Sequence, residues 1–257
     1  MASDRDRMAA RIFLYAVLPV ARTIVADDPA MAARFAGVRA RIQFRAEDPA
    51  GTMGAWLAFD RGQSSFHQGL CEAPDLTFAF ASLAKMNAFF AGKPVVPRIS
   101  GWWRAGLLLK TVSLLMALKI LMPESDPKDP AKRRLKVKLT FYMITTALSQ
   151  YNKGGDPQMQ KWTAGQPERI YQITVDEDIA AYLRVKAGRT QAGRGRYTRR
   201  KPFVHMNFNG VEGAYPIVMN QVDMVAAIRR GYLSIEGSPE YAGQLGDFMV
   251  RIQELIT

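Results

Sequence analysis

The residues best suited to chemistry are few and widely separated in this 257-residue chain. His67 and His205 are its only histidines, and neither has other metal-ligating residue types at ligand spacing around it. Cys71 is the single cysteine, which excludes an intramolecular disulfide and any multi-cysteine metal site. The acidic residues 176–178 are typical of an exposed turn, and no nucleophile elbow, dinucleotide fingerprint or P-loop occurs. We therefore expect no metal, no cofactor and no catalytic residues, and we predict that the chain is not an enzyme.

Apolar side chains offer a different chemistry, because aromatic rings and methionines can line a pocket that accepts ligands of varied shape. An ordinary hydrophobic core is the alternative interpretation of the same residues. The candidates for ligand contact are Trp56, Phe59, Phe78, Phe80, Met86, Phe89, Phe90, Trp102, Trp103, Leu107, Leu108, Leu115, Met206, Phe208, Met224, Phe248 and Met249.

The chain is strongly basic, with a net charge of +12 and a pI near 10.0. Such a balance favours an acidic partner: an anionic membrane surface, an acidic enzyme or nucleic acid. One basic cluster lies at the start of a predicted helix and consists of Lys132, Arg133, Arg134, Lys136 and Lys138. The other surrounds Tyr197 and consists of Arg189, Arg194, Arg196, Arg199, Arg200 and Lys201. We interpret these clusters as a solvated face or as a contact to anionic lipid. Nucleic acid is less favoured, because no stacking pair of aromatic residues or recognition helix accompanies the charges.

Internal repetition indicates how these residues are positioned. Three pairs of matching residues each stand 126 positions apart: Trp56 and Tyr182, Gly62 and Gly188, Gly69 and Gly195. Residues 74–80 are then matched by residues 202–208, and residues 99–101 by residues 235–237. A strand led by an aromatic residue, a glycine turn, two further strands and a helix recur in the same order. The pattern predicts a duplicated α+β module.

The hydrophobic periodicity and turn residues place the elements of each copy. In the first copy we expect helices over 5–26, 29–36, 83–91 and 107–122, and strands over 38–44, 56–59, 63–68, 76–80 and 98–100. In the second copy we expect helices over 131–151, from an Asn220 cap to Arg230, and from Ser238 onward, with strands over 170–175, 203–208 and 232–235 and a hairpin from Tyr182. Residues 123–130 hold three prolines among charges, which predicts a linker between domains 1–122 and 131–257.

Two apolar stretches require a test for membrane insertion. Residues 12–18 could be taken for a signal peptide, but Pro19 and Arg22 interrupt the run, so an opening helix is favoured over export. The stretch 107–122 would form a helix of about 24 Å, shorter than the roughly 30 Å hydrocarbon core of a bilayer. Because Lys110 and Lys119 lie on opposite sides of that helix, we expect it to be buried in protein.

The strings PDLTFAFASL at 74–83, NAFFAGKP at 87–94 and GYLSIEG at 231–237 resemble the sterol carrier protein 2 (SCP2) family. The resemblance extends over roughly residues 35–120 and 165–257. It implies a curved, mainly antiparallel sheet covered by helices, enclosing an apolar tunnel for lipids, sterols or acyl chains, and no catalytic chemistry. In the second copy Phe203 stands where Asp75 stands in the first, so the resemblance leaves open whether the second pocket is functional.

These observations predict a cytoplasmic α+β protein of two SCP2-like modules that binds and transfers a sterol, a fatty acyl chain or an isoprenoid-type lipid. Residues 102–122 are expected to form a wall or lid of the tunnel, and the basic clusters to bring the protein to anionic membranes. The first alternative is an accessory subunit that presents a hydrophobic substrate to an acidic partner enzyme. The second is a nucleic-acid-binding protein that uses the loop 194–201.

Overall fold

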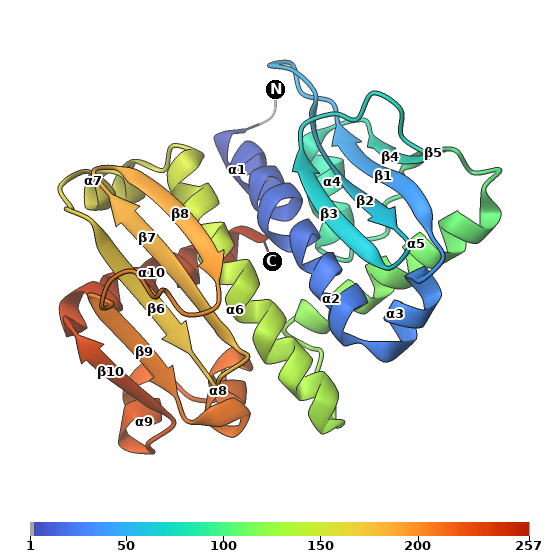
Figure 1. Ribbon diagram of the computed structural model, residues 1–257. Coiled ribbons are helices and arrows are strands. Elements are labelled where there is room, and N and C mark those ends of the chain that lie inside the picture. The colour runs from blue at the N-terminus through green and yellow to red at the C-terminus, as the bar shows by residue number, and fades with distance from the viewer. Residues whose placement is uncertain (1–2, 257) are drawn as a thin grey trace. The chain divides into compact units, whose positions relative to one another are not determined.

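The computed structural model describes residues 3–256 and confirms the α+β fold (Figure 1). The chain divides into two compact units. Unit 1 comprises the chain up to Lys119 together with the last residues from Leu255, and unit 2 runs from Ile120 to Glu254. The division therefore falls a few residues before the predicted linker 123–130.

Each unit is built on one five-stranded sheet, and the two sheets have the same topology. In unit 1 the order is β3 (Gln63–Gln68), β2 (Met53–Asp60), β1 (Arg39–Ala46), β4 (Leu76–Phe80) and β5 (Arg98–Ser100). In unit 2 the order is β8 (Arg189–Arg194), β7 (Ala180–Lys186), β6 (Arg169–Thr174), β9 (Val204–Phe208) and β10 (Leu233–Gly237). The central pairs β1–β4 and β6–β9 are parallel and the other pairs antiparallel, so the predicted duplication is confirmed.

A glutamine at the centre of each sheet shows that the two copies also agree in register. Gln43 of β1 lies opposite Trp56 and Thr77, and Gln172 of β6 lies opposite Tyr182 and His205. The Gln43 side-chain oxygen accepts a hydrogen bond from the backbone N–H of Cys71 at 2.6 Å. The Gln172 side-chain oxygen accepts one from the backbone N–H of Tyr197 at 2.9 Å.

Both glutamines are buried, and their partners Cys71 and Tyr197 are again 126 residues apart. Each amide therefore holds down the segment that leaves the edge strand β3 or β8 and crosses to the far side of β1 or β6. The crossing segment needs this bond because its backbone lies over the sheet, where an unpaired buried donor is costly. Sequence reasoning did not single out either glutamine.

The helices of unit 1 cover one face of its sheet. They are α1 (Asp4–Ile12), α2 (Ala21–Asp27), α3 (Pro29–Phe35), α4 (Leu83–Phe90) and α5 (Ala105–Leu118). A π turn over Phe13–Val17 and a 3-10 turn over Leu18–Val20 join α1 to α2, as expected where Pro19 supplies no N–H to the helical ladder. The predicted helix over 5–26 is thus confirmed as one helical rod with an irregular middle. Asp28 caps α3 through the Met31 N–H, as predicted.

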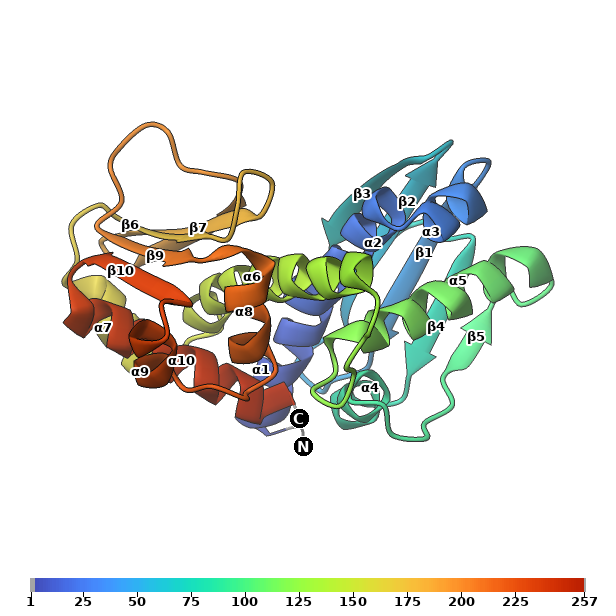
Figure 2. The ribbon, with the colours of Figure 1, turned by 90° about the horizontal axis from the view of Figure 1, so that it is seen from below.

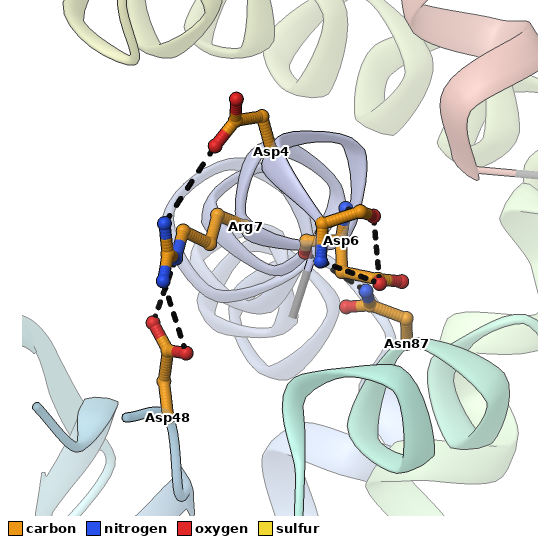
Figure 3. A network of polar contacts seen from close by, with 6 residues as sticks. Asp4, Asp6, Arg7, Asp48 and Asn87 are labelled. Carbon is orange, nitrogen blue, oxygen red and sulfur yellow. Dashed lines mark hydrogen bonds and ion pairs between the residues drawn. The ribbon is translucent and has the colours of Figure 1, made fainter. Parts of the chain in front are cut away.

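Polar contacts fix the N-terminal end of that rod (Figure 3). Ser3 and Asp6 form a reciprocal capping box at the start of α1. The Arg7 Nε donates to an Asp48 carboxylate oxygen at 2.8 Å, and the Asp48 side chain is only 3% exposed. The Asn87 side-chain N–H donates to the Asp6 carbonyl at 2.9 Å. These bonds tie α1 to the β1–β2 turn and to α4, so one end of the helical layer is fixed against the sheet.

The helices of unit 2 differ from prediction after β9. They are α6 (Pro130–Lys153), α7 (Pro157–Ala164), α8 (Gly210–Val218), α9 (Met224–Arg229) and α10 (Pro239–Ile256). The expected Asn220 cap is wrong, because Asn220 has a φ of 53° in the turn between α8 and α9, whereas the expected end of that helix near Arg230 is confirmed. Asp223 caps α9 instead, accepting from the Ala226 N–H at 2.8 Å. Neither α7 nor α8 was predicted, and Pro216 inside α8 disguises that helix in the sequence.

The segment predicted as a linker is fastened within unit 2. The buried Lys136 ammonium donates to the carbonyls of Met122 at 2.8 Å and Ser125 at 2.7 Å. Tyr215 donates to Asp126 at 2.7 Å, and burial together with that carboxylate raises the pKa of Tyr215 to about 12. Composition alone suggested a free segment, because it does not reveal partners that lie on α6 and α8.

Two equivalent glycines complete the match between the units. Gly101 follows β5 with a φ of 85°, and a Cβ there would collide with the Asp75 carbonyl. Gly237 ends β10 with a φ of 98°, and a Cβ there would collide with the Phe203 carbonyl. Both positions therefore need glycine for two reasons: the backbone is left-handed, and it closely approaches the residue just before β4 in unit 1 or β9 in unit 2.

We expect Gly101→Ala to lower the free energy of unfolding by about 2–4 kcal/mol, because backbone strain and steric overlap add. The matched control is Gly62→Ala in the β2–β3 turn, where φ is 87° but the added Cβ meets open space. That control should cost only about 1 kcal/mol. Urea denaturation of both variants measures the difference, and equal losses would contradict the close approach at Gly101.

We expect Lys136→Met to release the segment 122–129 and to lower the free energy of unfolding by about 1–2 kcal/mol, because two carbonyls lose a charged donor. Limited proteolysis should cut the segment faster in this variant than in Lys132→Met, which removes an exposed lysine from the same helix.

The same variant has a pH signature. Burial lowers the pKa of Lys136 below its ordinary value of 10.5. Between the folded and unfolded pKa values the unfolded chain binds more protons, so the stability of the wild type should rise with pH in that window. Lys136→Met should lose this rise in denaturant titrations at alkaline pH, and an unchanged slope would show that Lys136 does not cause it.

Candidate functional site

The candidate ligand site is the apolar layer between the sheet of unit 1 and α5. Strand alternation directs Ile42 and Phe44 of β1 and Leu57 of β2 to the helical side of the sheet. Thr111 and Leu114 are buried on the facing side of α5. A small, partly enclosed cavity of about 10 Å³ lies within this layer. Its lining is Leu18, Ala21, Ile42, Phe44, Leu57, Thr111, Leu114, Leu115 and Leu118.

Most of the aromatic residues predicted to line a tunnel pack against one another on the helical side of the sheet. Phe59, Phe78, Phe80 and Met86 are all less than 5% exposed. Phe80 and Phe89 have ring centroids 5.1 Å apart, and Phe90 stacks on Phe13 at 5.5 Å. In this structure the rings thus fill the space near α4, and the cavity lies beside them under α5. Of the predicted contacts, Leu115 lines that cavity.

Trp56 lies on the opposite face of the sheet from Phe59, Phe78 and Phe80. It pairs with His67 across β2 and β3, and the two rings stack with centroids 3.9 Å apart. The Ser65 hydroxyl lies 2.8 Å from the His67 Nε2 on the same open face. Trp56 is therefore separated by the sheet from Phe59, three positions along the strand, because successive residues alternate between faces.

The helix α5 is not buried on all sides, which corrects the expectation from its sequence. Its buried stripe consists of Thr111, Leu114 and Leu118. Its outer stripe consists of Leu109, Val112 and Met116, which are 69%, 40% and 56% exposed. Leu107 and Leu108 are half-buried. Leu107 stands four residues before Thr111 and continues the buried stripe, whereas Leu108 lies between the two stripes.

The tryptophans just before α5 are also exposed rather than inside the unit. Trp102 is 65% exposed and Trp103 is 70% exposed, with ring centroids 6.4 Å apart. The sequence analysis did not identify the outer stripe of α5 as a surface, although the spacing of three and four residues between its members is present in the sequence. The signal was overlooked because the helix is apolar on both sides and shows no polar face.

Few polar contacts hold α5 in place. Arg104 at its start forms an ion pair with Asp75 at 2.5 Å. Arg34 of α3 donates to the Ser113 hydroxyl, and both groups are exposed. The Thr111 hydroxyl donates to the Leu107 carbonyl within the helix and so ties α5 to nothing else. The position of α5 over the apolar layer therefore depends mainly on the packing of its buried stripe.

The corresponding layer of unit 2 is filled by interlocking rings. Met206, Phe208 and Phe248 are buried, while Met224 and Met249 are half-buried. Phe208 packs on a ring of α6, Phe141, at 4.8 Å, and Phe248 meets a ring of α7, Trp162, at 5.5 Å. The Arg169 guanidinium lies between two further rings, 4.0 Å from Phe203 and 4.4 Å from Tyr241. This packing gives the second module a solid aromatic core.

The basic loop 194–201 connects β8 to β9 and exposes all five predicted contacts, Arg194, Arg196, Arg199, Arg200 and Lys201. Arg194 lies over the Tyr142 ring at 4.8 Å, and Arg200 lies 3.9 Å from Glu168. Glu168 also pairs with Arg184 at 2.7 Å, and the hydrogen bond from Arg184 holds the pKa of Glu168 below its usual range. Part of the loop's charge is therefore already compensated within unit 2.

An open cleft of about 810 Å³ lies in unit 2 where β6 and β9 end. Arg196 reaches its lining, together with Asp176, Glu177 and the first residue of α8, Gly210. Asp176 is already paired with Arg134 and accepts the backbone N–H groups of residues 178 and 179. The lining mixes both signs of charge, so the cleft does not specify one class of ligand.

The groups that could do chemistry stay apart in space. Among residues 3–256 no three His, Cys, Asp or Glu side chains come close enough together to hold a metal ion. His205 bonds to the Thr174 hydroxyl at 3.0 Å, and burial lowers its pKa.

One rod in the described part of the chain, Asp4–Asp27, is long and apolar enough to cross a membrane. Within it, 72% of the most apolar window is buried inside the protein, as in the core helix of a soluble protein, although a signal sequence would pass the same test.

Comparisons with known proteins give little assistance. No family model matches the chain, and no curated protein matches it. Among solved structures it is similar to a double mutant of the sec-alkyl sulfatase PisA1, with 12% identity and a TM-score of 0.29. It is also similar to the stereoselective inverting sec-alkylsulfatase Pisa1 from Pseudomonas sp., with 14% identity and a TM-score of 0.27. The matches cover 56% and 55% of this chain but 28% of each sulfatase, so the chain spans under a third of their length.

Proposed function

We propose that unit 1 binds and carries an apolar molecule, such as a sterol, a fatty acyl chain or an isoprenoid, between its sheet and α5. The resemblance to the SCP2 family suggested this role. The observation that supports it is the small apolar cavity under α5, whose lining contains Thr111 as its one polar side chain. The protein would act without chemistry of its own, in the cytoplasm.

The size of the cavity determines how a ligand would enter. A volume of about 10 Å³ accommodates about one water molecule, so a lipid must displace α5 from the sheet. Such a displacement is feasible because α5 is held by the stripe Thr111, Leu114 and Leu118 and by few polar bonds. The helix would then serve as the lid of the site rather than as a fixed wall.

A rough energy estimate is compatible with a carrier that must also release its ligand. Burying about 400 Å² of apolar ligand surface contributes on the order of 10 kcal/mol. Association entropy and the displacement of α5 offset part of this, which leaves affinities in the micromolar range. In this proposal unit 2, whose aromatic layer is filled, carries no ligand and contributes the basic loop.

We expect a dansyl-labelled fatty acid to bind the wild-type chain with a micromolar Kd and to become more fluorescent as it leaves water. Leu114→Trp, which places a larger side chain in the cavity lining, should weaken binding at least about tenfold. Leu109→Trp adds the same ring to the exposed side of the same helix and should leave the Kd within about twofold.

Thermal melting of both variants shows whether a loss of binding reflects a filled cavity or an unfolded protein. Native mass spectrometry of the wild type provides the second measurement. A stoichiometric apolar molecule that is lost on denaturation would support the proposal. A wild-type chain that carries no such molecule and also fails to bind the labelled fatty acid or a fluorescent sterol would overturn it.

A further inference from the structure

The surface segment Lys93–Lys119 combines two features that the fold itself does not require. Its exposed side chains include Trp102, Trp103 and the outer stripe of α5, Leu109, Val112 and Met116. Its charged residues are five basic ones and no acidic one: Lys93, Arg98, Arg104, Lys110 and Lys119. We propose that this segment, here called the docking face, binds the surface of an anionic phospholipid bilayer.

The apolar half of the docking face is continuous along one side of α5. Leu109, Val112 and Met116 are spaced by three and four residues, so their side chains follow one another along the same side of the helix. Trp102 and Trp103 precede the helix in the chain and are exposed as well, at 65% and 70%. Exposed apolar residues scattered singly are ordinary on a protein surface, whereas five large ones in one short segment are the kind of surface that serves as an interaction site.

The charges select the partner. All five charges of the segment are basic, and of these Lys93, Arg98, Arg104 and Lys119 are exposed. Arg104 forms an ion pair with Asp75 of the same unit. Tryptophan and leucine on one side with basic residues around them are the composition of helices that lie in the headgroup region of anionic membranes. An acidic protein would match the charges but would not require five large apolar residues.

The length of α5 determines how it would lie. A helix of 14 residues is about 21 Å long, which is too short to cross a hydrocarbon core of about 30 Å. The buried stripe also remains on the sheet, so the outer stripe would enter the interface with the helix parallel to the membrane plane. Figure 2 shows α5 in green, alongside the sheet of unit 1.

This face differs from the one that sequence reasoning proposed for anionic surfaces, the loop 194–201 of unit 2. That loop exposes charge without large apolar side chains, and one of its arginines, Arg200, is close to Glu168. A purely electrostatic contact of that kind is lost at high salt. The docking face should instead retain part of its binding, because apolar insertion is not screened.

The test is co-sedimentation of the full chain with vesicles of phosphatidylcholine containing about 30 mol% phosphatidylglycerol. We expect the wild type to bind these vesicles and Trp102→Ala/Trp103→Ala to bind at least about tenfold more weakly. The matched control is Val225→Ala/Val250→Ala, which removes two exposed apolar residues from unit 2 and should bind like the wild type. Arg98→Gln/Lys119→Gln should weaken binding to the anionic vesicles and reduce its dependence on salt.

A depth measurement identifies the residues that enter the bilayer. Vesicles with brominated acyl chains should quench the tryptophan emission of the wild type, and Trp102→Phe/Trp103→Phe should abolish that quenching while retaining binding. No binding by the wild type, or binding that the Trp102→Ala/Trp103→Ala variant retains in full, would overturn the proposal. A dimer in solution that shields the docking face would also overturn it, because the patch would then be an interface between two copies.

The vesicle assay is independent of the proposed carrier function, because it requires no ligand in the cavity. Leu114→Trp should therefore bind vesicles like the wild type even where it no longer binds the labelled fatty acid. Loss of vesicle binding in this variant while it remains folded would show that membrane binding depends on the site under α5, and the docking face as proposed would be wrong.

Discussion

The parallel pair at the centre of each sheet constrains the rest of the module. The hairpin β2–β3 places the chain at one edge of the sheet, whereas β4 must lie on the other side of β1. The chain has to cross the open face to reach that position, and its backbone groups need partners on the way. Gln43 in unit 1 and Gln172 in unit 2 each supply one hydrogen-bond acceptor for this segment from the centre of the sheet. The helices are left to cover the other face, and α5, the last of them in unit 1, is held mainly by its buried stripe Thr111, Leu114 and Leu118.

The duplication could be predicted because turns and strand starts carry strong local signals. The β2–β3 and β7–β8 hairpins depend on glycines at fixed positions, and these survive in both copies. Elements that depend on distant partners were predicted less well. The segment 123–130 has the composition of a linker, yet Lys136 and Tyr215 hold it from two helices. The helix α8 begins at a glycine and contains Pro216, so its formation depends on packing that local propensity cannot reveal.

The candidate site was predicted in kind but not in detail. The sequence indicated that aromatic and aliphatic side chains crowd unit 1, but a list of apolar residues does not assign them to faces. Trp56 and Phe59 show the reason, since they lie on opposite sides of one strand. For α5 the difficulty is different: a helix that is apolar on both sides has no polar stripe to mark its outer surface. Only the packed structure shows which of its leucines, Leu114 or Leu109, touches the sheet.

The exposed stripe of α5 and the cavity beneath it are related through the free energy needed to move α5 away from the sheet. Lifting a lid into water would expose Leu114 and Leu118 in addition to Leu109 and Met116, which are already exposed. At a lipid surface the same movement would leave all four side chains in an apolar environment. A helix with two apolar sides is thus poorly suited to a soluble core and well suited to a lid that opens at a membrane. In this view the outer stripe lowers the free energy of the open state at a membrane surface and not in water. Opening is then favoured at the place where a lipid ligand can be exchanged.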